Sequence, residues 1–145
     1  MIEFLKLHLQ NMQSETFKKL AIGSAFVTGL TVALGAVGAH WFSHQPVSEK
    51  AIDIYNKATL YLLLHSMVVC IICMFKVKTN LAISPRPLLL MFLGALLFSV
   101  CVYLVAFSYM PHLGHFKVAG MIAPIGGILM IISWMDLSFA LSKAL

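Results

Sequence analysis

The chain has 145 residues, of which 61% are hydrophobic and only 10% are charged, and its mean hydropathy is +0.95. Charged residues make up about a quarter of a typical soluble domain, so this composition excludes a soluble globular protein. The formal net charge is +5, but the ten Lys and Arg residues stand at the ends of apolar blocks without a basic run, which excludes a nucleic-acid-binding surface.

The chain opens with residues 2–17, in which Ile2, Leu5 and Leu9 fall near one helical face. This pattern is typical of a short interfacial helix, and a frayed terminal tail is the alternative. Residues 20–41 then form the first apolar block, which at about 1.5 Å per residue can cross a hydrocarbon core of about 30 Å. The block predicts a transmembrane helix, because it is longer than the apolar run of a cleaved signal peptide.

The second apolar block covers residues 58–75, and its helix is predicted to begin earlier, near Glu49, because Ser48 can cap the first amide groups. The third block covers residues 88–110. It follows the segment 84–87, whose two prolines forbid a continuous helix from the second block and predict a tight loop.

The fourth apolar block, residues 118–141, contains Pro124 and the pair Gly126-Gly127, which predict a local bend. Together the four blocks predict an all-α integral membrane protein. We expect a single domain over residues 1–145, built as a bundle of four transmembrane helices.

The orientation follows from the basic residues that flank the four blocks. Three of them, Lys50, Lys57 and Lys117, lie on one side. The other side carries seven: Lys6, Lys18, Lys19, Lys76, Lys78, Arg86 and Lys143. The richer side is predicted to be cytoplasmic, which gives a multi-pass membrane protein with both termini inside.

Small residues mark the helix faces that can approach another helix closely in lipid. The first block carries Gly29, Gly35 and Gly38, and the fourth carries Ala123 and Gly127. We therefore expect these residues to pack helices together. The first and fourth helices are candidates for mutual contact, within one subunit or between subunits.

His40 and His65 are the best candidates for a binding site, with Tyr61 one helical turn from His65. A histidine within a span suggests function, so a metal, haem or quinone held near the external leaflet is one hypothesis. The other is a structural hydrogen bond from a neutral imidazole to a backbone carbonyl or a tyrosine. We favour the structural role and expect no cofactor.

Two histidine pairs have spacings that could place both imidazoles on one metal ion: His40 with His44, and His112 with His115. Neither pair has a cysteine nearby, and loop carboxylates would have to complete the coordination. Such pairs alone are weak signals, so we expect no metal site.

Four motifs, in order and spacing, resemble domain-of-unknown-function family 423, small inner-membrane proteins of the YgdD type with eukaryotic relatives called transmembrane protein 256. The motifs are Ala33-Leu34-Gly35-Ala36-Val37-Gly38-Ala39-His40, Tyr61 with His65, Leu97-Phe98-Ser99 with Tyr103, and Pro124-Ile125-Gly126-Gly127 followed by Trp134. The resemblance implies four spans and supplies no activity. His44, His112 and His115 match none of these motifs.

Three functions remain open. The first is a non-enzymatic scaffold or accessory subunit in the lipid bilayer, whose partner is a second copy or another membrane protein; few convergent polar groups argue against an enzyme. The second is the metal, haem or quinone binder at His40 and His65. The third is a minimal transporter that uses the break at residues 124–127, since discontinuous helices line many transport sites.

Overall fold

The computed structural model describes residues 1–144 except 43, 45–46, 80–82 and 111–112. The described residues form helices and no strand: α1 (Ile2–Phe42), α2 (Glu49–Lys78), α3 (Arg86–Phe107), the short 3₁₀-helix η1 (Gly114–Met121) and α4 (Ala123–Ala144). Four stretches are long and apolar enough to cross a membrane, the fourth being η1 and α4 taken together. The all-α prediction and the number of spans are confirmed.

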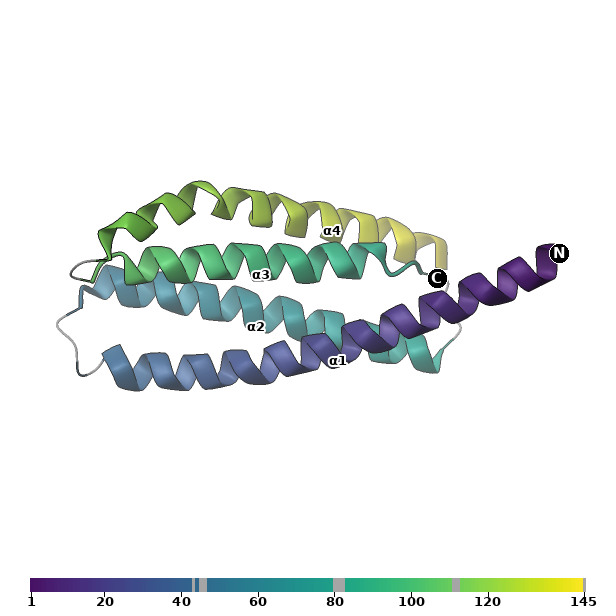
Figure 1. The fold of residues 1–145 in the computed structure, drawn as a ribbon, viewed down its shortest axis with the longest axis horizontal. Coiled ribbons are helices and arrows are strands. Elements are labelled where there is room, and N and C mark those ends of the chain that lie inside the picture. The colour runs from purple at the N-terminus through teal and green to yellow at the C-terminus, as the bar shows by residue number, and fades with distance from the viewer. Residues whose placement is uncertain (43, 45–46, 80–82, 111–112, 145) are drawn as a thin grey trace.

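The helices stand in a row in the order of the chain (Figure 1). Each runs antiparallel to the one before it, so both termini lie at the same end, which we call the terminal end; the other is the opposite end. α1 packs on α2, α2 on α3 and α3 on α4, while α1 touches α3 only slightly. The described parts of α1 and α4 do not touch, so the predicted contact between the first and fourth helices is wrong within one subunit.

α1 is longer than its membrane span. Its 41 residues extend about 60 Å, and its first part projects beyond the other helices (Figure 1). Residues 2–17 are therefore not a separate helix, because the sequence contains no glycine or proline before Gly23 that would interrupt α1. Phe17, where this extension joins the core, is only 1% exposed.

The predicted start of α2 near Glu49 is confirmed, whereas α3 begins two residues before the predicted start of its apolar block at residue 88. α2 begins at Glu49, and the Ser48 hydroxyl accepts a hydrogen bond from the backbone N–H of Ala51 at 3.3 Å. α3 begins at Arg86, with Pro87 in its first turn, where a missing N–H costs no intrahelical hydrogen bond.

The bend predicted in the fourth span lies at the boundary between η1 and α4. Pro124 is the second residue of α4, so it starts the α-helix instead of kinking its middle. From Ala123 onward α4 has 22 residues, which cover about 33 Å without a break. The discontinuity is thus near one end of the span, whereas the broken helices of transporters expose their sites near the membrane midplane.

Two of the five predicted packing residues, Gly35 and Gly38, lie against α2, and a third, Ala123 of α4, is buried. A Cβ atom on Gly38 would overlap the Tyr55 ring of α2, and one on Gly35 would lie 3.4 Å from Thr59.

The other two predicted packing glycines are less constrained. A Cβ atom on Gly29 would meet no atom within 4 Å, so this glycine packs against nothing in its own subunit. One on Gly127 would lie 3.9 Å from Phe98, an ordinary contact with α3. The tight approach of α3 and α4 instead joins Gly94 and Gly126, where the added Cβ of Gly126 would lie 2.8 Å from the Gly94 carbonyl oxygen. The glycines of α1 that do pack thus lie against α2, and those of α4 lie against α3. Neither set brings α1 and α4 together.

Hydroxyl groups cross each helix contact in addition to the small residues. The Thr28 hydroxyl donates to Ser66 Oγ at 2.9 Å between α1 and α2. The Tyr55 hydroxyl donates to the Leu34 carbonyl at 2.7 Å between the same helices. The Ser133 hydroxyl donates to the Pro87 carbonyl at 2.6 Å between α4 and α3. Such bonds fix how far one helix is shifted along the next.

Candidate functional site

His65 hydrogen-bonds on both sides of its ring. Nδ1 lies 2.8 Å from the carbonyl oxygen of Tyr61, one turn earlier on α2, and Nε2 lies 3.3 Å from the indole nitrogen of Trp134 on α4. A carbonyl can only accept and an indole N–H can only donate. Both bonds are satisfied together only when Nδ1 carries the proton and Nε2 is a free acceptor. The surroundings therefore select one neutral tautomer.

Aromatic rings surround this histidine and join three helices. The Tyr61 ring stacks on His65 at 5.9 Å between centroids, and Phe98 of α3 lies 5.0 Å from Tyr61. The Trp134 ring meets His65 edge-on at 6.2 Å. Tyr61 and Trp134 are 43% and 45% exposed, so this group of four side chains, the His65 cluster, lies on the outer surface of the helix row, which faces lipid in a membrane.

His40 and His65 lie at different levels of the bundle. The Thr28–Ser66 hydrogen bond places His65 level with Thr28, and His40 is twelve residues further along α1, about 18 Å away along its axis. The cause is that α2 begins at Glu49, which puts His65 about 24 Å from the start of its helix. The two histidines are therefore not neighbours, so the expectation that they share one site does not hold, and only Tyr61 lies beside His65.

The described histidines at the opposite end, His40, His44 and His115, are not part of a complete set of metal ligands. The rings of His40 and His44 meet edge-on with centroids 4.9 Å apart, and His115 packs on Phe116 at 4.2 Å. His112 lies outside the described residues. Within the part of the chain that the structure describes, no three His, Cys, Asp or Glu side chains converge on a point where a metal ion could bind.

The His65 cluster is suited to holding helices together. The hydrogen-bond partners of the imidazole are a carbonyl and an indole, and neither can be activated as a nucleophile. Asp136, the carboxylate of α4, lies two residues beyond Trp134 and has its Oδ2 3.9 Å from Arg86 Nε. The cluster therefore fits a hydrogen bond between α2 and α4, which share no direct backbone contact.

Sequence reasoning did not identify Trp134 as the partner of His65. The two residues are 69 positions apart, and helical periodicity relates only residues on the same helix. One signal was available, because an indole N–H within an apolar span needs an acceptor. His65 offers an imidazole acceptor at middle depth in another predicted span.

Comparison with known proteins identifies the family of the chain. Residues 34–127 match the family described as "Protein of unknown function (DUF423)". The chain is 32% identical over 114 residues to a UPF0382 membrane protein of Staphylococcus epidermidis, which covers 79% of this chain and 87% of that protein. It is also 32% identical over 126 residues to a UPF0382 membrane protein of Staphylococcus haemolyticus, which covers 87% of this chain and 97% of that one. No solved structure matches. The four apolar helices and these relatives show a multi-pass membrane protein, and the chain belongs to the DUF423 family that its four motifs resemble.

Proposed function

We propose that the protein is a non-enzymatic scaffold or accessory subunit of a bacterial-type inner membrane, and that it assembles with another transmembrane helix through α1. The observation that carries this proposal is the environment of Gly29, where a Cβ atom would meet no atom within 4 Å. Ala25, Ala33 and Ala36 on the same stripe are also exposed. We call these four residues the open α1 face.

The open α1 face has the chemistry of a helix contact. Ala25, Gly29 and Ala33 repeat at intervals of four residues, the small-xxx-small spacing that lets two helix backbones approach in lipid. α1 stands at the edge of the row, so none of the helices that the structure describes covers this face. Two glycines elsewhere on α1, Gly35 and Gly38, already pack on α2. The simplest occupant is α1 of a second copy, because identical small-residue stripes complement each other.

The test compares two glycine substitutions on the same helix. Gly29→Leu places a bulky side chain on the open α1 face. Gly23→Leu is the matched control: a Cβ atom there also meets nothing within 4 Å, but Gly23 lies about 120° away around the helix. We expect wild type and Gly23→Leu to purify in mild detergent as oligomers, or with a copurifying membrane protein. Gly29→Leu should be a monomer without a partner, with unchanged thermal stability.

Two outcomes would contradict the proposal. One is a wild-type protein that light scattering finds monomeric and that copurifies with nothing. The other is a Gly29→Leu variant whose assembly equals that of wild type. Loss of assembly in both leucine variants would also count against the open α1 face, because a bulky residue anywhere on α1 would then have the same effect.

A further inference from the structure

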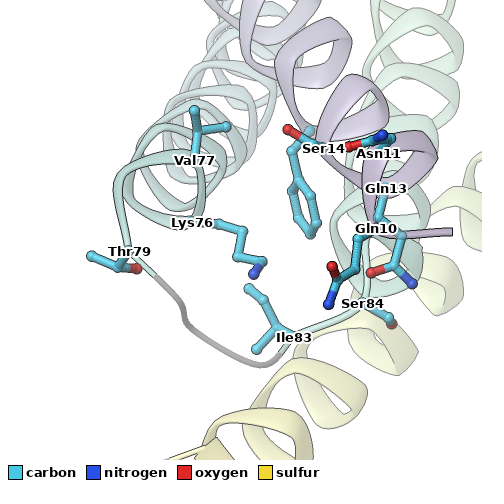
Figure 2. A pocket seen from close by; sticks show the side chains of 10 residues that line it. Gln10, Asn11, Gln13, Ser14, Lys76, Val77, Thr79, Ile83 and Ser84 are labelled. Atoms are coloured by element: carbon cyan, nitrogen blue, oxygen red, sulfur yellow. The ribbon is translucent and has the colours of Figure 1, made fainter. Parts of the chain in front are cut away.

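A cavity of about 840 Å³ opens at the terminal end, where the extension of α1 passes the end of α2 and the start of α3. Figure 2 shows its lining and the Lys76 side chain pointing into the space between Gln10 and Ile83. Ten of the residues that the structure describes line this cavity, and nine of them are uncharged: Gln10, Asn11, Gln13, Ser14, Phe17, Val77, Thr79, Ile83 and Ser84. The tenth is Lys76, so the described part of the lining contains a cation and no carboxylate.

The polar lining consists of amide and hydroxyl groups, which can both donate and accept hydrogen bonds, and it sits on an apolar floor. Six residues offer an amide or a hydroxyl group, and all but Thr79 are exposed. Phe17 and Ile83 are 1% and 4% exposed and close the cavity toward the core. Amides and hydroxyls can donate hydrogen bonds to an anion or to water, so they do not select between the two. The positive charge of Lys76 therefore makes an anion the preferred ligand of the cavity.

The Lys76 charge has no acidic partner in the described residues. Its Nζ lies 5.9 Å from the centroid of the Phe17 ring. The two acidic side chains that form ion pairs at this end do so with other basic residues, Glu15 with Lys18 at 2.8 Å and Asp136 with Arg86 at 3.9 Å. The negative end of the α2 dipole and the positive end of the α3 dipole both reach the cavity and oppose each other. The side chains therefore give the cavity its positive character.

We propose that this cavity binds the phosphate group of an anionic phospholipid. The lining residues of α1 precede its apolar block at residue 20, and those of α2 follow its apolar block at residue 75, which places the cavity at the level of lipid headgroups. Lysine binds phosphate as a point charge, and basic residues beside a transmembrane helix attract anionic lipid. A free phosphate ion has the same chemistry, and the experiment separates the two sources.

The experiment uses the full chain in nanodiscs of pure phosphatidylcholine or of phosphatidylcholine with phosphatidylglycerol, released into the gas phase for native mass spectrometry. Lys76→Gln removes the charge in the cavity. Lys78→Gln is the matched control, because it removes the same charge from the same last turn of α2 but lies outside the lining. We expect wild type and Lys78→Gln to retain phosphatidylglycerol, and Lys76→Gln to retain about tenfold less, as the loss of one charge-assisted contact implies.

Further measurements keep the outcomes distinct. Lys76→Arg should restore retention, which shows that Lys76→Gln acts through charge and not through misfolding. Equal losses in Lys76→Gln and Lys78→Gln, or unchanged retention in Lys76→Gln, would overturn the proposal. In lipid-free detergent, inorganic phosphate is titrated in a thermal-shift assay. Lys76-dependent stabilisation by phosphate, without retained phosphatidylglycerol, would assign the site to free phosphate and overturn the lipid assignment.

Discussion

Gly126→Ala is a substitution for which the structure predicts a large loss of stability from a single methyl group. The added Cβ would lie 2.5 Å from the backbone nitrogen of Phe98 and 2.8 Å from the carbonyl oxygen of Gly94. It would also lie 2.9 Å from the Cα of Phe98. All three atoms belong to the backbone of α3, so no side-chain rotation can relieve the overlap. α3 and α4 would have to move apart.

The magnitude follows from two opposing effects. Inserting a methyl group into a well-packed contact costs about 1–3 kcal/mol, and overlap with three backbone atoms places Gly126→Ala at the upper end of that range. Alanine is favoured over glycine in a helix by about 0.5–1 kcal/mol, which offsets part of the cost. The net loss is about 2 kcal/mol, or about thirtyfold in the unfolding equilibrium. Separation would also lengthen the hydrogen bond from Ser133 to Pro87.

The neighbouring glycine supplies the control. In Gly127→Ala the nearest atom to the new methyl group is Phe98 Cδ2 at 3.9 Å, so this variant should be as stable as wild type or slightly more stable. The assay is unfolding of detergent-solubilised protein by increasing mole fractions of dodecyl sulfate, followed by helical circular dichroism. If the two variants unfold within about 0.5 kcal/mol of each other, α3 and α4 do not approach at Gly126 as the structure shows.

Two further predictions concern the α1–α2 contact and the orientation. Tyr55→Phe deletes the hydroxyl that donates to the Leu34 carbonyl at 2.7 Å, and should lower the free energy of unfolding by about 1 kcal/mol in the same assay; an unchanged value would show that this bond contributes nothing. For the orientation, reporters fused after Lys143 and within residues 76–86 should read as cytoplasmic and one near Pro46 as external, and the reverse pattern would refute the basic-residue count.

The transmembrane helices were predictable because their causes are local. An apolar block needs a certain length to cross a membrane, and this length is visible in the sequence. The start of α2 at Glu49 depends on the adjacent Ser48, and the start of α3 depends on two prolines within four residues. The continuation of α1 through residues 2–17 was equally local, but the amphipathic pattern of that segment suggested a separate helix. The absence of a helix breaker before Gly23 was the stronger signal.

The contacts between helices were not predictable, because several small-residue faces compete for the same neighbours. Gly29 and Gly38 are nine residues apart and lie on opposite sides of α1, and their sequence surroundings do not show which side meets α2. The antiparallel register decides this, since it brings Tyr55 to Gly38 and leaves Gly29 outside. The adjacent Gly126 and Gly127 pose the same problem. Only the rotation of α4 about its axis determines that Gly126 meets α3 most closely.

The His65 cluster shows why an ionisable residue within a span need not be a reactive one. Nδ1 of His65 donates to the Tyr61 carbonyl oxygen and Nε2 accepts from the Trp134 indole, so both ring nitrogens have hydrogen-bond partners within the protein. The bond to Trp134 joins α2 to α4, two helices that are not neighbours in the row and share no backbone contact. An imidazole that already bonds on both sides fits a structural contact better than a site for a ligand, which leaves the open α1 face and the cavity at Lys76 as the surfaces for binding.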